Sequence, residues 1–501
     1  MPKPTLDEMT AAAAAAEGPS TVRELDKSHS AIDPCGLRET NFEMMDLVAD
    51  GLNNVARHVR PFTVVTWAWR RAYRLLEEAG KPVLDDRMFS QIEDFVSRIE
   101  TVFAWSNFLA DPRTQLPGAS ALLPIINSSE YTFGGPGWQS FDKVRRTSTA
   151  LSAAINYGPG LKSLGWLTRH PDISRVLVPA PEAAAALDAF EERIKDRLDH
   201  PAFSAFGTVM VTRAEALAWA EGWSLESLTD EERAFAARTL YGDLATPARA
   251  KGIGYLLQAA DALGGMDVGD IRKAVSGEAG GFGPDGDTAE TAARWKDLQV
   301  RQLFRLSVEA LLAWILDRLS DGPMETHALA AKFMAEAEID PSATGGQGVL
   351  ALAHRDEPIS ETLDAITAAL AHPLREGLAL SIARGLALSV ANAPCQAQSY
   401  DRDTRLPLAK AAQQAQAHSG RRAGDLVKHV IETWALAQHV YWAVGRGLQD
   451  ARRGGKTILR LKAVVDEGGW TVPPGRRRLS PNPTPDRIQT ALMLAAECAT
   501  A

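Results

Sequence analysis

The sequence predicts a mainly α-helical, multi-helical protein with one small β element near the C-terminus. Along most of the 501 residues, an apolar side chain recurs at every third or fourth position, which is the period of an amphipathic helix. Prolines, glycines and short polar residues separate these periodic stretches, as expected where helices begin and end. Only the region 457–473 alternates apolar and polar residues, a pattern typical of strands joined by a turn.

The first helices begin after a leader that has no apolar stripe. From Asn41 the apolar period continues until Pro61, which predicts a helix that ends before this proline. A second helix is expected at about 64–78 and a third at about 86–110. Further helices in this half are predicted at about 181–199, 213–220, 229–240 and 244–263.

The segment 116–139 interrupts this helical series. It is rich in Pro, Gly and Ser, carries Tyr131, Phe133 and Trp138, and shows no helical period. Long irregular segments inside compact proteins are usually functional, and aromatic side chains are enriched where proteins bind one another. We therefore expect an irregular loop that contributes an interaction surface.

The second half begins with a glycine-rich stretch. Residues 264–287 contain Gly-Gly pairs and few bulky apolar side chains, apart from a short candidate helix at 268–275, which favours a linker. Helices are then predicted at about 288–319, 323–338, 358–371, 374–392, 405–418 and 422–450. The β element at 457–473 follows, and a final helix begins after Asp486. The predicted organisation is a disordered leader (1–30), an N-terminal helical domain (31–263), a linker (264–287) and a C-terminal helical domain (288–501).

The composition favours a cytoplasmic protein that is not drawn to nucleic acid by its overall charge. Its net charge of −9 gives no global attraction for phosphates, so a nucleic-acid contact would be local or indirect. Three cysteines far apart in sequence predict neither a disulfide framework nor a zinc knuckle. The apolar run of the leader is too short for a signal peptide, and Arg384 interrupts the longest apolar run, so we expect no membrane segment.

Searches for catalytic motifs find no strong match. The sequence has no GxxxxGK[ST] phosphate loop, no GxSxG elbow and no HExxH pair, so no catalytic residue, cofactor or metal is predicted. His429 and His439 are ten residues apart on one predicted helix, an axial separation of roughly 15 Å that is too large for a shared metal. Each is better explained as a hydrogen-bonded or solvent-facing histidine.

Two groups of side chains are candidates for binding. On the predicted helix 64–78, Trp67, Arg70, Arg71 and Tyr73 lie close together, and core anchoring is the simpler explanation for the aromatic rings. The two arginines cannot both point inward, so at least one should bind a carboxylate, a carbonyl or a partner. Arg476, Arg477 and Arg478 form a basic cluster that suits phosphate or an acidic partner surface, or is simply solvated.

Several short motifs carry a family resemblance. Asp33-Pro34-Cys35-Gly36 is followed by Thr63, Thr66, Arg70 or Arg71, Ala72 and Tyr73, and related phrases occur at 157–165, 467–470 and 484–487. This pattern resembles uncharacterised bacterial families with a D-P-x-G start and a T-x-x-T-x-R-A-R-Y-like helix, from which Trp67 and Trp69 depart. Such proteins are similar to accessory subunits encoded beside helicases, phospholipase-D-like nucleases or methylases in antiviral defence islands. The resemblance implies a setting and no catalytic residue.

The leading functional prediction is a non-enzymatic accessory or scaffold subunit that binds other proteins, with a helicase or a nuclease as the expected partner. One alternative is an enzyme, a nuclease or hydrolase, whose carboxylates are dispersed along the sequence. Another is a DNA-binding adaptor in which the 157–167 region or the C-terminal strand pair forms a winged-helix-like element. Buried polar clusters in a concave pocket favour the enzyme, an exposed apolar patch the subunit, and a contiguous basic groove the adaptor.

Overall fold

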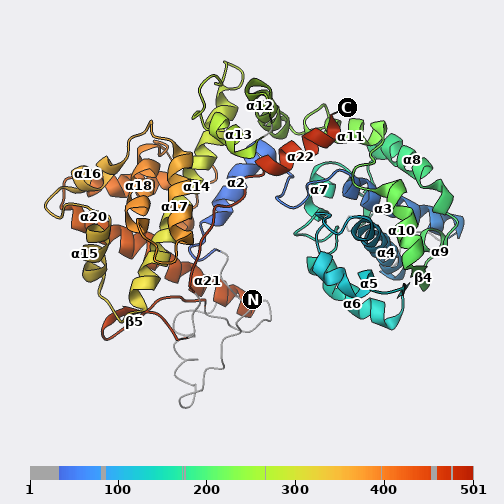
Figure 1. The fold of residues 1–501 in the computed structure, drawn as a ribbon, viewed down its shortest axis with the longest axis horizontal. Coiled ribbons are helices and arrows are strands. Elements are labelled where there is room, and N and C mark those ends of the chain that lie inside the picture. Colours follow the sequence, from blue (N-terminus) through green and yellow to red (C-terminus); the bar gives the residue numbers. More distant parts are fainter. Residues whose placement is uncertain are drawn as a thin grey trace, which may run out of the picture.

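Helices dominate the protein, and they gather into two lobes joined by a bridge (Figure 1). The computed structural model describes residues 33–80, 86–171, 173, 176–265, 267–396, 398–452, 460–474 and 478–499. The strands of these residues form three short antiparallel pairs. The predicted mainly α-helical class is confirmed, as is the small β element near the C-terminus. The predicted leader, residues 1–30, lies outside the described residues.

The first lobe is built around two long helices, α3 (Arg60–Glu78) and α4 (Asp86–Ala110), which pack against each other. Both are largely buried in the first hydrophobic core, because bulky apolar side chains recur along more than one of their faces. Around them lie η1 (Ala119–Leu122), α5 (Leu123–Ile126), β1 (Glu130–Phe133), α6 (Pro136–Ser148), α7 (Gly158–Ser163), β2 (Leu167–Arg169), β3 (Leu177–Pro179), η2 (Pro181–Ala183), α8 (Ala184–Arg193), η3 (Lys195–Arg197), α9 (Pro201–Ser204), β4 (Val209–Thr212), α10 (Arg213–Trp223) and α11 (Asp230–Leu240).

Capping residues explain where α10 and α11 begin. Thr212 accepts a hydrogen bond from the Glu215 N–H, and the Glu215 carboxylate accepts one from the Thr212 N–H. Thr229 and Glu232 form the same reciprocal pair at the start of α11. Each capping box satisfies two N–H groups that a helix terminus leaves without partners. The starts predicted at about 213 and 229 agree with these caps.

The bridge consists of α2 (Arg38–Ala49), α12 (Pro247–Leu263), α13 (Val268–Val275), the start of α14 (Ala289–Leu319) and α22 (Ile488–Cys498) (Figure 1). Helix α14 passes from one core to the other: Trp295 and Leu298 lie in the first core, and the side chains from Val300 onward lie in the second. Helices α2 and α12 pack so closely that a Cβ atom at Gly252 would lie 1.7 Å from the Val48 carbonyl oxygen. Only glycine permits this approach.

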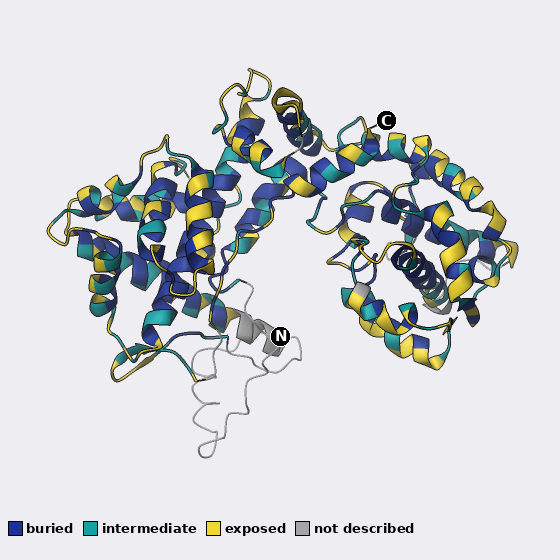
Figure 2. Ribbon diagram, viewed as in Figure 1, coloured by how far each residue is buried: buried dark blue, intermediate teal, exposed yellow. Residues whose placement is uncertain are grey.

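The second lobe surrounds the rest of α14, which Figure 2 shows almost entirely in the colour of buried residues. Helix α18 makes its most extensive contact with α14. The elements here are α15 (Thr326–Glu336), α16 (Gly345–Gly348), η4 (Leu350–Leu352), α17 (Ile359–Ala371), α18 (Leu378–Ala391), η5 (Asp403–Arg405), α19 (Leu408–Ala417), α20 (Ala423–His429), the π-helix η6 (Val430–Ala437), α21 (Gln438–Arg452), β5 (Val464–Asp466) and β6 (Gly469–Thr471). Among the described residues, no helix combines the length and the apolarity needed to cross a membrane.

Each core includes segments from distant parts of the chain. Helix α22, near the C-terminus, packs on α11, α12 and α13 in the first core. Cys35 and Leu37, from the first described residues, lie in the second core. The glycine-rich stretch 264–287 contains α13, whose Ile271 and Val275 are buried in the first core. The boundaries of the domains at 31–263 and 288–501 and of the linker between them stay predictions.

Two strand pairs in the first half differ from the sequence prediction. Strand β1 pairs with β4, and β2 pairs with β3. The segment 116–139, expected to be irregular, holds η1, α5, β1 and the start of α6, so that expectation is wrong for most of its length. Elements of three or four residues are too short to show a period, and β1 pairs with a strand far along the chain.

Candidate functional site

The segment Asp33–Gly36, here called the signature loop, is held tightly at the start of α2. The Asp33 carboxylate accepts hydrogen bonds from the N–H groups of Leu37 at 3.0 Å and Arg38 at 3.3 Å. Gly36 has a φ of +70°, and a Cβ atom there would lie 2.2 Å from the Trp442 ring. A glycine is therefore required at the end of this loop, because both its backbone conformation and its neighbour exclude a side chain.

Helix α21 binds the signature loop through two adjacent side chains. The Gln438 Nε2 donates to the Cys35 carbonyl at 2.8 Å. The buried His439 ring has Nδ1 2.8 Å from the Pro34 carbonyl oxygen, and its Nε2 accepts from the Lys462 N–H at 2.8 Å. A carbonyl only accepts and an amide N–H only donates, so this ring is the neutral tautomer with its proton on Nδ1. His439 thus connects the signature loop to Lys462.

His429, on the helix that precedes η6 and α21, lies apart from His439, as the sequence spacing predicts. His429, at the end of α20, stacks on His418 with the ring centroids 4.5 Å apart. Burial lowers the pKa of His429, and the neighbouring His418 lowers it further. The rings of His429 and His439 therefore differ in surroundings and share no site. The π-helix η6 lies between these two residues, and π-helical turns within α-helices often occur at functional positions.

A buried ion pair lies beside the signature loop. Arg305 and Glu309 are one turn apart on α14, with Arg305 Nη1 2.7 Å from a Glu309 carboxylate oxygen, and both are almost fully buried. Burial raises the pKa of Glu309 to about 7, although Arg305 lowers it and Asp33 raises it further. Burial also raises the pKa of the Cys35 thiol, and Glu309 adds to this shift. Cys35 is therefore a protonated, unreactive thiol.

The C-terminal segment 482–487 is bound to the same helix. Arg305 Nη2 donates to the Asn482 carbonyl at 2.6 Å, and Gln299 Nε2 donates to the Asp486 carboxylate at 3.1 Å. Asp486 also pairs with Arg272 of α13 at 2.6 Å. The 484–487 motif is thus bonded to α14, and the Cys35 thiol of the 33–36 motif lies close enough to Glu309 of the same helix for that carboxyl to raise its pKa.

The polar stripe of α14, which binds the C-terminal segment, was not among the predicted site residues. Gln299, Gln302, Arg305 and Glu309 recur every three or four positions along a helix whose buried side chains are mostly apolar. All four side chains are buried, and the first three hydrogen-bond the C-terminal segment. The detectable signal was a polar residue at each turn among mostly apolar neighbours, which predicts a polar partner from the same chain.

The predicted residues on α3 serve the core of the first lobe. Trp67 and Trp69 are buried, and Trp67 Nε1 donates to Glu191 of α8 at 2.8 Å. The prediction that an arginine of this helix binds a carboxylate or a carbonyl is confirmed for both. Arg70 pairs with Asp188 at 2.6 Å and also binds Glu191, while Arg71 donates to the Phe203 carbonyl at 3.1 Å.

Tyr73 joins α3 to strand β3. Its hydroxyl donates to the Leu177 carbonyl at 2.6 Å. Burial raises the pKa of this phenol, so it stays protonated as a donor. Trp67, Arg70, Arg71 and Tyr73 together hold α3 against α8, α9 and β3, a structural role that accounts for all four side chains.

The aromatic side chains of the 116–139 segment also face the core. Phe133 and Trp138 are buried with their ring centroids 4.9 Å apart in an edge-to-face arrangement, and Tyr131 packs on Phe133 at 5.0 Å. Such pairs stabilise a core beyond the area they bury. The interaction surface expected here is therefore not presented by Phe133 and Trp138, and only the half-buried Tyr131 is partly accessible.

Arg478 lies at a large concave surface, here called the basic hollow, at the C-terminal end of α14. The hollow has a volume of about 600 Å³, and its lining includes Arg318, Arg375, Lys462 and Arg478. Asp317 lies between two of these cations, 2.9 Å from Arg375 Nη1 and 3.2 Å from Arg478 Nη2. Of the predicted basic cluster, Arg478 therefore lines a concave surface. Arg476 and Arg477 lie outside the described residues.

The chain matches no protein-family model, no curated protein and no solved structure. Within the described ranges, no three His, Cys, Asp or Glu side chains are placed to hold one metal ion. The signature loop, the α14 stripe and the basic hollow are three of the places where polar side chains from distant segments meet.

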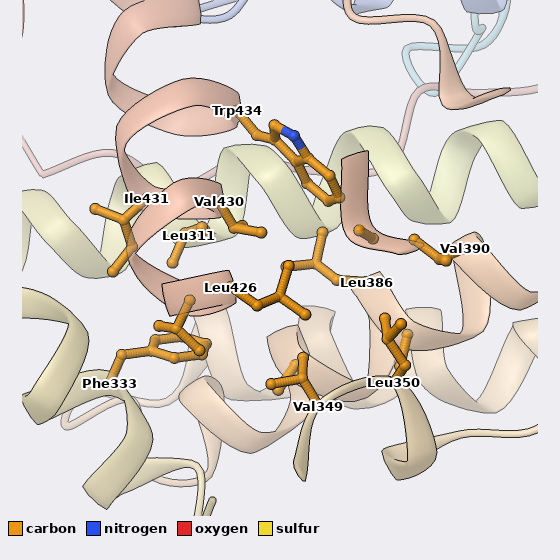
Figure 3. A pocket seen from close by; sticks show the side chains of 14 residues that line it. Leu311, Phe333, Val349, Leu350, Leu386, Val390, Leu426, Val430, Ile431 and Trp434 are labelled. Atoms are coloured by element: carbon orange, nitrogen blue, oxygen red, sulfur yellow. The ribbon is translucent and has the colours of Figure 1, made fainter. Parts of the chain in front are cut away.

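The second lobe also contains an apolar cavity between α14, α15, α18 and η6 (Figure 3). Its volume is about 20 Å³, and its lining, which includes Phe333, Leu386, Leu426 and Trp434, is entirely apolar. A cavity of this size holds no more than a water molecule, and apolar cavities stay dry. Without a polar group to orient a ligand, this cavity is a packing feature and not a second site.

Proposed function

We propose that the protein is a non-enzymatic helical accessory or scaffold subunit that binds other proteins in a bacterial multi-protein system. Antiviral defence or DNA processing is the setting that the resemblance of the 33–36 and 63–73 motifs suggests, with a helicase or a nuclease as the partner. Cytoplasmic localisation belongs to the same proposal.

The proposal is supported by the contacts of the buried titratable side chains near the signature loop. Both nitrogens of His439 are bound to backbone groups, and Arg305 and Glu309 neutralise each other inside the protein. The Cys35 thiol is buried with a raised pKa. A general acid, base or nucleophile must reach its substrate, and these groups instead connect segments of the same chain. Their arrangement supports a structural body that presents its surface.

The surface beside the basic hollow supports binding to a protein. Leu374, in the wall of the hollow, is 73% exposed, and Val465, on the nearby β5–β6 hairpin, is 67% exposed. Exposed apolar side chains next to arginines are the composition found where proteins bind one another. Neither Leu374 nor Val465 belongs to a hydrophobic core, so the fold does not explain their apolar character.

We expect the tagged full-length protein, purified from its native host, to enrich a helicase or nuclease over a tag-only control and to lack hydrolytic activity of its own. Mass spectrometry identifies the partner, and nuclease and nucleotide-hydrolysis assays with Mg²⁺ or Mn²⁺ test the activity. Deleting 116–139 is unsuitable as a control, because Phe133 and Trp138 belong to the core. Metal-dependent DNA cleavage that is lost on replacing a single carboxylate would favour the enzyme alternative and overturn the proposal.

A further inference from the structure

We propose that the stacked imidazoles of His418 and His429 form an acid-sensitive latch, which holds α19 against α20 and η6 at neutral pH and releases it in acid. His418 directly follows α19, and His429 is the last residue of α20. Their ring centroids are 4.5 Å apart, the ring planes are 22° from parallel, and both residues are half-buried. The latch is independent of the proposed function, because every contact that forms it lies within the second lobe.

The hydrogen bonds of the latch suit two neutral rings. His418 Nδ1 lies 2.9 Å from the Gln414 carbonyl oxygen, which only accepts, so this nitrogen carries the proton. The side-chain oxygen of Gln414 accepts from Trp434 Nε1 at 2.7 Å and lies 3.4 Å from His429 Nε2. His429 Nδ1 lies 3.4 Å from the Thr433 hydroxyl, which can donate to it. Gln414 thus connects both rings to η6, and neither Gln414 nor Thr433 carries a charge that could balance a protonated ring.

Acid weakens the latch, because two protonated rings in a stack repel each other. Burial lowers the pKa of His429 from 6.5, His418 lowers it further, and Glu432 raises it. Among the described residues, these are the two titratable groups that act on His429, so α15 and α16, which also pack on α20, contribute none. Glu432 lies 3.9 Å from Lys428 Nζ, which offsets part of its charge. Because the folded pKa of His429 is below its usual value, the stability of this contact is complete above about pH 6.5 and is lost as the pH falls below it.

The latch lies beside the apolar cavity of the second lobe (Figure 3). Ala415 of α19, Leu426 of α20 and Trp434 of η6 all line this cavity, so the contact between α19 and the other two helices closes one of its walls. The turn at 418–422 is held separately, by backbone hydrogen bonds to residues 343–346. Release of the latch should therefore move α19 away from η6 and expose apolar side chains, while the turn stays in place.

The test is a double-mutant cycle of His418→Gln and His429→Gln in the full-length protein, measured by urea-induced unfolding at pH 8 and pH 5. The cycle isolates the interaction between the two rings from the carboxylates that also titrate in this range. We expect either single substitution to lower the urea midpoint at pH 8, where it removes the stack, and to raise it at pH 5, where it removes the repulsion. His327→Gln is the matched control: its side chain is 71% exposed in the same lobe, and this change should not raise the midpoint at pH 5.

The dye anilinonaphthalene sulfonate, which fluoresces on exposed apolar surface, reports the expected opening. Its fluorescence should rise as the pH falls from 8 to 5, and the rise should be about half or less in either latch variant, with all proteins folded by circular dichroism at pH 8. A rise that both latch variants lose and His327→Gln keeps would support the latch. An interaction between the two rings with the same sign at both pH values would overturn the inference, as would a rise in fluorescence that neither His418→Gln nor His429→Gln reduces.

Discussion

Gly252→Ala is expected to destabilise the protein by about 3 kcal/mol or more, because overpacking at a rigid contact forces two backbones apart. The added Cβ would lie 1.7 Å from the carbonyl oxygen of Val48 and 2.6 Å from its carbonyl carbon. Neither atom can move without shifting α2, which contacts both α12 and α14. Trp295 Nε1 also donates to the Gly252 carbonyl at 3.2 Å, so the same shift would disturb a buried hydrogen bond.

Gly254→Ala on the same helix is the matched control. A Cβ atom at Gly254 meets nothing within 4 Å, and alanine favours a helix over glycine by about 1 kcal/mol. We therefore expect the two substitutions to have opposite signs in urea-induced unfolding. Equal midpoints for the two variants would show that α2 and α12 do not pack as described.

Arg305→Met is expected to lower the free energy of unfolding by about 3–5 kcal/mol at pH 8, since it leaves the Glu309 carboxyl buried without its cation. The substitution also removes the bond to the Asn482 carbonyl, which attaches the C-terminal segment to α14. Arg294→Met is the control on the same helix. Arg294 and Glu290 have the same spacing as Arg305 and Glu309, but their side chains are 40% and 74% exposed, so less than about 1 kcal/mol should be lost.

The pH dependence of this loss follows from the pKa of Glu309. Because the folded pKa of about 7 is above the usual value of 4.5, the stability that Glu309 contributes is complete below about pH 4.5 and is lost as the pH rises through 7. Removing Arg305 removes a group that lowers this pKa, so the decline extends to higher pH. We expect a smaller cost at pH 5 than at pH 8. An additional Glu309→Gln change should abolish the difference, and a pH-independent cost in Arg305→Met would contradict this account.

The helices could be predicted from sequence because their apolar periods are long and their ends are marked. Helix α4 spans 86–110 and α13 spans 268–275, as the sequence indicates. The first helix was predicted to run until Pro61, but α2 ends at Ala49 and Pro61 is in the first turn of α3. Proline ends a preceding helix and also suits the start of the next, so the residue alone does not decide between the two.

The candidate site was less predictable, because its parts come from distant segments. The sequence identified the signature loop and Arg478, but it gave no sign that His439 binds Pro34 or that Arg375 and Lys462 flank Arg478. The aromatic residues at 131–138 were assigned to a surface on composition. Phe133 belongs to β1, which pairs with a strand far along the chain, a contact that no local pattern encodes.

We expect the two lobes to fold as one unit, because the ends of the chain complete cores that lie far from them in sequence. Buried side chains of α22, including Ile488, Leu492 and Leu494, belong to the first core, and Cys35 and Leu37 belong to the second. Each fully buried leucine or isoleucine stabilises a core by about 1.5–3 kcal/mol, so a lobe without these segments should be unstable.

The most direct measurement is urea-induced unfolding of residues 31–263 and 288–501 produced as separate chains, compared with the full protein. We expect the full protein to unfold cooperatively and each piece to lack a cooperative transition, because α22 is absent from the first piece and residues 33–37 are absent from the second. Two pieces that each unfold cooperatively, with midpoints near those of the full protein, would contradict this account and establish two independent domains.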